Sequence, residues 1–237
     1  MKTAVIIPAG GRGSRMGGEI QKQYLMLGGM PILVRTLYAF QEAPLVDDIY
    51  LVLPADDLGR AQEQILSRYN LSKVKQVLRG GERRQDSVKA GVSALDVDYD
   101  IVLIHDGVRP FVSQAIIRRV IQEARQSKAV AIGIPAGDTV KKIDNCGFIV
   151  ETLNRDQLWL TQTPQAFAAS LLRKAYDIAY RDNYYGTDDA SLVERMGTKV
   201  KMLPGSANNI KITTPVDLQW GEFYLKYAVE EESDEPH

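Results

Sequence analysis

Residues 3–24, TAVIIPAGGRGSRMGGEIQKQY, join a short apolar run to a glycine-rich turn that carries basic side chains. The run Ala4–Ile7 has the length and β-branched content of a buried parallel strand, and Pro8 ends it because proline cannot donate to the ladder. The glycines that follow let backbone N–H groups approach an anion, and the cations add positive charge. This stretch therefore predicts a strand that leads into a phosphate-binding loop. The loop residues are Gly10, Gly11, Gly13, Arg15 and Lys22.

Two familiar phosphate-binding patterns do not fit this loop. A dinucleotide fingerprint needs a third glycine where Met16 stands, and an acidic residue about twenty positions further on. The next apolar run, Ile49–Leu53, leads instead to Asp56, which is too far along the chain to bind a ribose. A P-loop is excluded because Gly-Lys-Ser and Gly-Lys-Thr do not occur. A glycine-rich turn with incidental surface cations stays open as a purely structural interpretation.

The chain has 237 residues, of which 45% are hydrophobic, and a formal net charge of -1. This composition predicts a globular protein with a sizeable core, and the near-neutral charge disfavours a sequence-independent nucleic-acid binder. No apolar run approaches the roughly eighteen residues that span a bilayer, and the first residues do not form a signal-peptide pattern. We expect a cytoplasmic protein with small-molecule partners. Cys146, the only cysteine, is interpreted as a turn residue beside Gly147.

Strand-length apolar runs alternate with helical patterns up to residue 135. This alternation predicts an α/β fold with a Rossmann-like, mostly parallel sheet and helices on both faces. Ligands bind at the carboxyl ends of such strands, where the glycine-rich loop, Gly80-Gly81 and His105-Asp106 converge. The expected strands are 4–7, 48–53, 74–78, 101–104 and 129–134, and the expected helices are 31–42, 56–69, 86–95 and 113–126.

The pattern changes beyond Pro135. Residues 138–153 contain two strand-like runs around an Asn-Cys-Gly turn, so a β-hairpin should project from the sheet as an arm. Because a lone hairpin is marginal in water, we expect the arm to pack on a second subunit. We expect one domain over 1–230, with 137–156 as the dimerisation arm and 231–237 as a flexible acidic tail. The remaining expected elements are helices over 168–181, 189–196 and 215–227 and strands over 199–202 and 209–212.

The residues at the strand ends suggest phosphate chemistry. Asp106 suits Mg²⁺, which is bound by one or two carboxylates plus substrate phosphates, although a loop-bracing role is equally open for it. His105 is a candidate base, but we expect a histidine at this place to be packed or hydrogen-bonded. No G-x-S-x-G elbow and no histidine cluster occur, which excludes a serine-hydrolase triad and a histidine metal site. A basic, glycine-lined crevice remains, and it fits phosphoryl or nucleotidyl transfer.

Seven motifs in order resemble those of the isoprenoid-type nucleotidyltransferases, the family of 2-C-methyl-D-erythritol 4-phosphate cytidylyltransferases. No single motif decides the resemblance, but together they extend over nearly the whole chain. Gly107 stands where the family has an alanine. The motifs are PAGGRGSRM (8–16) with KQY (22–24), GGER (80–83) through DSV (86–88), HDGVRP (105–110), DTVK (138–141), Arg155 with LW (158–159) and QTPQ (162–165), TDDAS (187–191), and NIKIT (209–213).

The resemblance implies that CMP is transferred from CTP to 2-C-methyl-D-erythritol 4-phosphate, giving 4-diphosphocytidyl-2-C-methyl-D-erythritol and pyrophosphate, with Mg²⁺ at Asp106. Arg15 and Lys22 would stabilise the transition state, and Arg155 and Lys211 are implied as further catalytic cations. The implied CTP contacts are Ala9, Gly10, Gly11, Gly13, Gly80, Gly81, Glu82, Ser87 and Asp106. The implied acceptor contacts are Arg109, Thr139, Arg155, Thr187 and Lys211. In this family the arm crosses to the other subunit of a homodimer, so Thr139 and Arg155 would serve the neighbour's site.

Two other functions stay open. Ribitol 5-phosphate cytidylyltransferases share most of the nucleotide half, so only residues 158–165, LWLTQTPQ, favour the methylerythritol acceptor. A sugar-nucleotide-binding, glycosyltransferase-like protein on the same scaffold is the second alternative, because fold alone does not determine function. Such a protein would more typically supply a carboxylate pair for a metal and would lack the spacing of Arg15 and Lys22.

Overall fold

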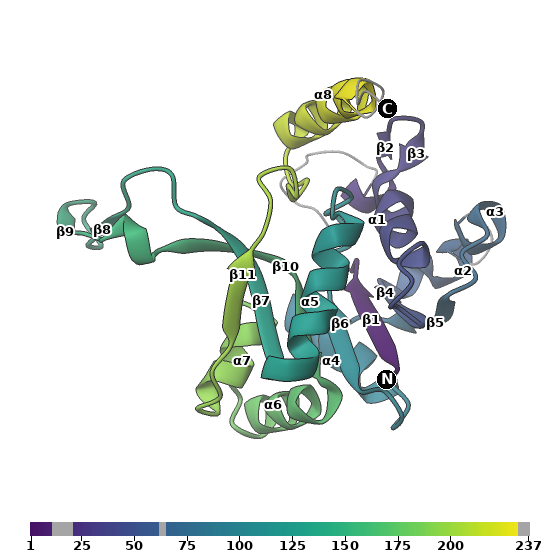
Figure 1. Cartoon of the computed structure of the whole chain (residues 1–237), viewed down its shortest axis with the longest axis horizontal. Coiled ribbons are helices and arrows are strands. Elements are labelled where there is room, and N and C mark those ends of the chain that lie inside the picture. Colours follow the sequence, from purple (N-terminus) through teal and green to yellow (C-terminus); the bar gives the residue numbers. More distant parts are fainter. Residues whose placement is uncertain (11–20, 62–64, 232–237) are drawn as a thin grey trace.

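The structure is a computed structural model, and it describes residues 1–10, 21–61 and 65–231. Seven strands form a central sheet in the order β11-β7-β10-β6-β1-β4-β5 (Figure 1). Six of them run in one direction, and β10 is antiparallel to its neighbours β6 and β7. The strands are β1 Thr3–Pro8, β4 Asp48–Leu53, β5 Val74–Arg79, β6 Ile101–Ile104, β7 Ala129–Pro135, β10 Trp159–Ala168 and β11 Lys201–Pro204. The predicted α/β fold with a mostly parallel sheet is confirmed.

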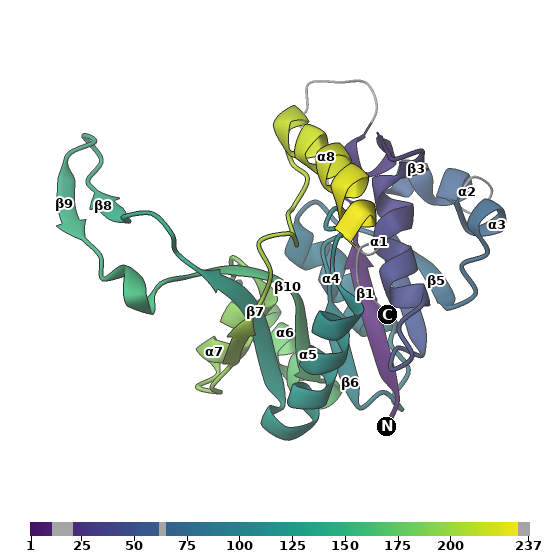
Figure 2. The same cartoon turned by 45° about the horizontal axis from the view of Figure 1, so that its top comes forward.

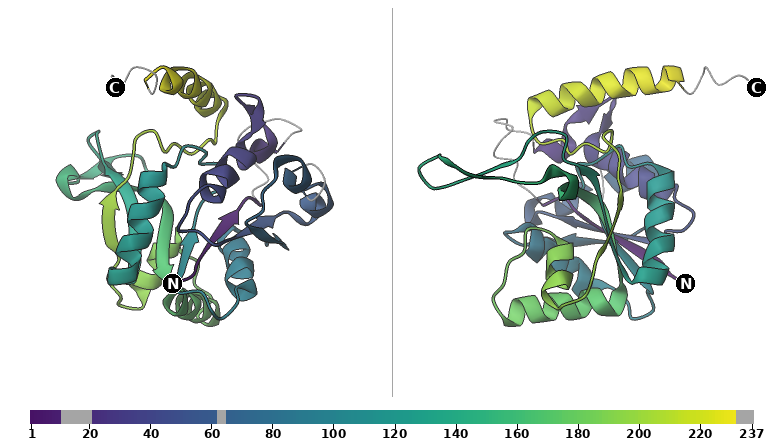
Figure 3. Two further views of the ribbon diagram at one scale, coloured as in Figure 1. Left: turned by 45° about the vertical axis from the view of Figure 1, so that its right-hand side comes forward. Right: turned by 60° about the vertical axis from the view of Figure 1, so that its left-hand side comes forward.

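Strand β1 lies inside the sheet because both of its faces are apolar, and all six of its residues are buried. Val5 and Ile7 pack into a cluster with helices α1 and α5, whereas Ala4 and Ile6 pack on the opposite face with α4, α6 and α7. Figure 3 shows these helices on the two faces of the sheet. The helices are α1 Ile32–Gln41, α4 Arg84–Ala94, α5 Gln114–Ser127, α6 Ala169–Arg181 and α7 Asp189–Arg195.

The segment between β7 and β10 projects from the sheet as an arm, as the sequence predicts (Figures 1 and 2). Strands β8 Lys141–Ile143 and β9 Ile149–Thr152 pair antiparallel at its end, and the 3-10 turn η4 Arg155–Gln157 follows. The carboxylate of Asp144 accepts hydrogen bonds from the backbone N–H groups of Cys146 and Phe148, and Gly147 has a φ of 87°. Cys146 is exposed in this turn, which confirms its interpretation as a turn residue.

A third, smaller apolar cluster holds helix α8 Pro215–Glu231 over the carboxyl edge of the sheet (Figure 2). Leu27 and Ile32, from the region of strands β2 Met26–Leu27 and β3 Met30–Pro31, are buried there against Val108 and Ile212. This packing fixes the segment that leads into α8, and it places that segment at the edge where ligands bind. Among the described helices, none is long and apolar enough to cross a membrane.

Several predicted elements differ from the structure. Strand β10 was missed, because its buried centre is polar rather than apolar. The predicted strand 209–212 is wrong: no strand forms there, and the segment is held by single hydrogen bonds such as that from Ile212 N–H to the Val108 carbonyl. The predicted helix 56–69 begins with the 3-10 turn η2 Ala55–Asp57 and α2 Leu58–Ala61 and ends with α3 Ser67–Tyr69, and residues 62–64 lie outside the described residues. Helix α8 continues to Glu231, and residues 232–237 of the predicted tail lie outside the described residues.

Candidate active site

A cleft opens at the carboxyl ends of β1, β5 and β6, beside Gly10 and the Gly80-Gly81 turn. Lys22 and Lys211 line it together with most of the predicted CTP contacts. Those contacts are Ala9, Gly10, Gly81, Glu82, Ser87 and Asp106. Three further predicted residues, Gly11, Gly13 and Arg15, lie outside the described residues. The structure thus brings together three chain segments that the strand-end argument placed at one crevice.

Two glycines in the turn between β5 and α4 are required by close approach. A Cβ atom on Gly80 would lie 2.7 Å from the Ser87 hydroxyl oxygen, and one on Gly81 would lie 2.3 Å from the Asp86 Cβ. Asp86 also accepts a hydrogen bond from the Arg83 N–H at 3.0 Å, which caps the first turn of α4. The start of α4 is therefore packed directly onto the strand end, with Ser87 buried beneath the cleft.

A second cleft adjoins the first. Arg109, Thr187 and Lys211, three of the predicted acceptor contacts, line it together with polar residues of β10. The other two, Thr139 and Arg155, lie on the exposed arm and line neither cleft. The guanidinium of Arg155 donates instead to the Gly137 carbonyl at 3.1 Å. Within one chain, therefore, the structure does not bring these two residues to the acceptor contacts.

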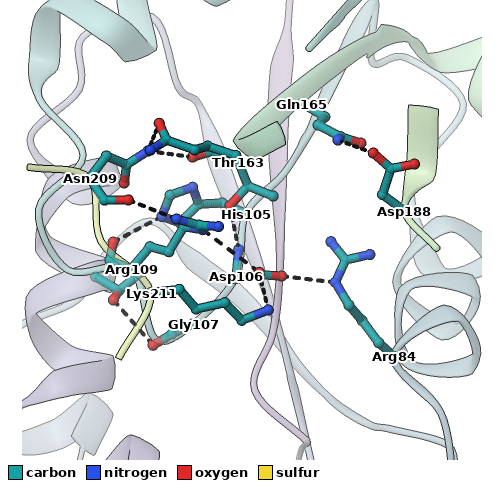
Figure 4. A network of polar contacts seen from close by, with 12 residues as sticks. Arg84, His105, Asp106, Gly107, Arg109, Thr163, Gln165, Asp188, Asn209 and Lys211 are labelled. Carbon is teal, nitrogen blue, oxygen red and sulfur yellow. Dashed lines mark hydrogen bonds and ion pairs between the residues drawn. The ribbon is translucent and has the colours of Figure 1, made fainter. Parts of the chain in front are cut away.

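Asp106 lines both clefts, and Figure 4 shows its contacts with the neighbouring cations. Its Oδ1 accepts a hydrogen bond from Arg84 Nε at 2.8 Å, and its Oδ2 lies 2.6 Å from Lys211 Nζ and 3.8 Å from Arg109 Nε. Burial alone would raise the pKa of this carboxyl, but Arg84 and Lys211 hold that pKa far below its ordinary value. Asp106 is therefore an ionised carboxylate, and it holds Lys211 at the place where the two clefts meet.

The sequence matches the family model IspD, 2-C-methyl-D-erythritol 4-phosphate cytidylyltransferase, over residues 3–227. The chain belongs to this family. It is 49% identical over 225 residues to the 2-C-methyl-D-erythritol 4-phosphate cytidylyltransferase of Syntrophus aciditrophicus, covering 95% of this chain and 96% of that protein. The corresponding protein of Geobacter metallireducens is 47% identical over 229 residues, covering 95% of this chain and 98% of its own.

Solved structures agree with this family assignment. The 4-diphosphocytidyl-2C-methyl-D-erythritol synthase of Anaerococcus prevotii matches with a TM-score of 0.84 at 34% identity, over 95% of this chain and 96% of that one. Membership makes the chain a nucleotidyltransferase of isoprenoid biosynthesis. The comparisons therefore favour the cytidylyltransferase interpretation over the glycosyltransferase-like alternative, and the methylerythritol acceptor over ribitol 5-phosphate.

One polar residue of this nucleotidyltransferase site, Arg84, was missed from the sequence. Its Nη2 donates to Asp189 Oδ2 at 2.8 Å, while its Nε holds Asp106. Burial by itself would lower the pKa of Arg84, but the two carboxylates raise it well above its ordinary value. The sequence feature that could have identified Arg84 is its place in the first turn of a helix, where the helix dipole disfavours positive charge.

Arg109 is held in place by a residue from the segment that precedes α8. Its Nη1 donates to the Asn209 carbonyl at 2.7 Å, and the buried Asn209 amide donates to the Thr163 carbonyl at 2.8 Å (Figure 4). Burial lowers the pKa of Arg109, although Asp106 opposes this effect. Asn209 was predicted as part of a strand and of the 209–213 motif without a role of its own, so its function as a brace between β10 and Arg109 was also missed.

His105 is packed in the core and does not line either cleft. Its Nε2 lies 3.0 Å from the Arg109 carbonyl oxygen, which accepts a hydrogen bond from it, and its ring centroid lies 4.8 Å from that of Phe40. Burial lowers the pKa of His105 to about 4. The histidine is therefore neutral at physiological pH, and the expectation that it is packed and hydrogen-bonded is confirmed.

Proposed function

We propose that the two adjoining clefts bind the two substrates of one reaction. CTP occupies the cleft beside the glycine-rich turns, and 2-C-methyl-D-erythritol 4-phosphate occupies the cleft beside Arg109 and Thr187. An oxygen of the acceptor phosphate attacks the α-phosphorus of CTP; the new P–O bond forms as the bond to pyrophosphate breaks. The observation that supports this assignment is that Arg84, Asp106 and Lys211 line both clefts, so that two phosphate-bearing substrates would meet there.

The charges of the site suit this chemistry. Attacker and target are both anions, so their repulsion and the charge that develops on the α-phosphate are the main obstacles. Lys22 lies on the CTP side and Arg109 on the acceptor side, with Lys211 between them. Arg15 is assigned with Lys22 to the transition state, on the family resemblance. No general base is needed, because a phosphate monoester is largely ionised at neutral pH.

Mg²⁺ is the divalent cation we assign to this site. Among the described residues there is no cluster of three or more histidine, cysteine, aspartate or glutamate side chains that suits a metal. A single carboxylate, that of Asp106, is enough for this ion, since Mg²⁺ is commonly held by one carboxylate together with substrate phosphates and waters. When bound, Mg²⁺ would neutralise charge on the CTP phosphates. The residues of the chain orient the substrates around it.

The arm belongs to the same proposal. Neither Thr139 nor Arg155 reaches a cleft of its own chain, and the arm exposes a set of large apolar side chains that a lone hairpin in water does not explain. These are Ile143, Phe148, Ile149 and Val150. In a homodimer whose arms cross, Thr139 and Arg155 would complete the partner's acceptor cleft.

We assign the enzyme to the cytoplasm, as one domain with residues 137–156 as its arm. Its partners are small molecules, and we assign it no nucleic acid.

The direct test is pyrophosphate release with each of the four nucleoside triphosphates against both acceptors. We expect turnover with CTP and 2-C-methyl-D-erythritol 4-phosphate that exceeds turnover with every other combination. A preference for ribitol 5-phosphate would overturn the acceptor assignment, and a preference for another nucleotide would overturn the base assignment.

The crossing of the arm is tested by mixing two impaired variants, Lys22→Ala and Arg155→Ala, under conditions that exchange subunits. In a heterodimer, the chain that carries Arg155→Ala keeps its own Lys22 and receives an intact Arg155 from its partner. With random exchange in a two-fold dimer, about a quarter of all sites should recover. If Arg155 served its own chain, every site would lack one cation, and mixing would restore nothing.

A further inference from the structure

Four side chains form a continuous polar chain from the buried side of the sheet to the junction of the clefts. The Tyr176 hydroxyl on α6 donates to Asp189 Oδ1 on α7 at 2.5 Å, and Asp189 Oδ2 accepts from Arg84 Nη2 at 2.8 Å. Arg84, in the first turn of α4, then holds Asp106 Oδ1 with its Nε at 2.8 Å. Tyr176 is fully buried and the Asp189 side chain is 1% exposed, so the far end of the chain is rigidly packed.

Stability alone does not account for this arrangement. A buried ion pair generally gives no more stability than a well-packed apolar pair of the same volume, because its charges must be removed from water. Arg84 also lies at the positive end of the α4 helix dipole, which opposes its charge. Residues that break local preferences in this way are concentrated at functional sites.

The geometry fixes one oxygen of Asp106 on Arg84 and directs the other to Lys211. A guanidinium is a planar fork, so contacts through Nε and Nη2 set its plane, and Asp189 thereby sets the direction from which Arg84 approaches Asp106. The Asp106 backbone N–H is fixed as well, since it donates to the Thr163 hydroxyl at 3.1 Å. Oδ2 consequently faces Lys211.

We propose that Arg84, anchored by Asp189, is a positioning residue that orients Asp106 and, through it, Lys211 between the two substrates. The inference rests on the proposed placement of CTP and the acceptor in the two clefts. It assigns no contact with substrate to Arg84. A purely structural link between α4 and α7 would instead affect only how much protein is folded.

The test compares kcat, expressed per folded protein, in two variants and one matched control. Arg84→Lys keeps the charge but not the two-pronged geometry, and Arg84→Met with Asp189→Asn removes the buried ion pair without leaving a lone charge. The control is Arg173→Lys, because Arg173 on α6 also links to α4, by donating to the Val92, Leu95 and Asp96 carbonyls at the end of α4 remote from the clefts. Thermal unfolding reports the folded fraction of each protein.

We expect kcat to fall by about a hundredfold in both Arg84 variants, the loss typical of a misplacement of about 1 Å, with the KM for CTP changed by less than about threefold. Arg173→Lys should lower the unfolding temperature without changing kcat. A parental kcat in the folded double variant, or an equal loss of kcat in Arg173→Lys, would overturn the positioning role. A parent enzyme that releases no pyrophosphate from CTP and 2-C-methyl-D-erythritol 4-phosphate would overturn the proposed function instead.

Discussion

The buried imidazole of His105 predicts that the free energy of unfolding falls when the solution is acidified. The ring is 0% exposed, lies against Phe40 and donates to the Arg109 carbonyl. Burial lowers its pKa from 6.5 to about 4, because the charged form loses its hydration in the core. In the unfolded chain the same ring regains an ordinary pKa.

The size and sign of the effect follow from proton linkage. Between pH 6.5 and 4 the unfolded chain binds a proton at His105 and the native protein does not, so stability rises with pH in this window. The stabilisation from the neutral ring is fully present above pH 6.5 and is lost as the pH falls toward 4. A difference of about 2.5 pKa units corresponds to about 3 kcal/mol of unfolding free energy.

Urea unfolding of the parent and of His105→Gln, followed across this pH range, isolates the contribution. A glutamine amide also offers an N–H to the Arg109 carbonyl but does not titrate, and carboxylates common to both proteins cancel in the comparison. We expect the advantage of the parent over the variant to shrink by about 3 kcal/mol between about pH 7 and pH 4. A difference in unfolding free energy that stays constant with pH would refute the argument. Separately, a loss of turnover in His105→Gln as large as that expected for Lys22→Ala would show that His105 acts as a base.

Three further outcomes are expected. Lys22→Ala should lower kcat by about a hundredfold while CTP binding changes far less, because the charge of Lys22 matters most in the transition state. Pyrophosphate release measures kcat and a CTP titration measures binding. A kcat within about threefold of the parent would contradict the catalytic role of Lys22. Gly81→Ala should weaken CTP binding, since its Cβ would lie 2.3 Å from a side chain in the first turn of α4, whereas Gly59→Ala, with nothing within 4 Å of its Cβ, serves as the control. Asn209→Ala should lower the unfolding free energy by about 1–3 kcal/mol and raise the KM for the acceptor, because the Asn209 amide braces β10. The control is Asn208→Ala, which should change neither quantity because the Asn208 side chain is exposed.

The parallel strands and the location of the site could be predicted because both depend on local sequence. A strand buried on two faces is a short apolar run, as in Ala4–Ile7, and the carboxyl edge follows from the βα alternation. Strand β10 has no such signature. Its centre, Gln162–Gln165, is buried but polar, and its side chains are satisfied by residues far along the chain, such as Asp188, which accepts from Gln165 at 2.7 Å. The alternating Ile210-Lys211-Ile212 mimics a strand, yet its isoleucines pack beneath α8.

The same distinction separates the site residues that were found from those that were missed. Asp106 follows a strand directly, so its position in the chain already places it at the crevice. Arg84 acquires its role from a partner 105 residues away, and no spacing rule relates the two. Gly107 is explained only by the fold: a Cβ there would lie 2.8 Å from the Cβ of Ala9, so these two strand-end residues approach too closely for a side chain at position 107 unless the backbone shifts.

The contacts of the carboxylates of Asp106 and Asp189 indicate which kind of group this site transfers. A sugar-transferring protein on this scaffold would be expected to offer two carboxylates to a metal. Here one Asp189 oxygen accepts from the Tyr176 hydroxyl and the other accepts from Arg84. The same Arg84 guanidinium lies between Asp189 and Asp106 and donates to both. Asp106 is thus an ionised carboxylate with cations on three sides. An arrangement in which positive charge surrounds one acidic group favours a reaction between two phosphates, because there the energetic problem is the repulsion of like charges.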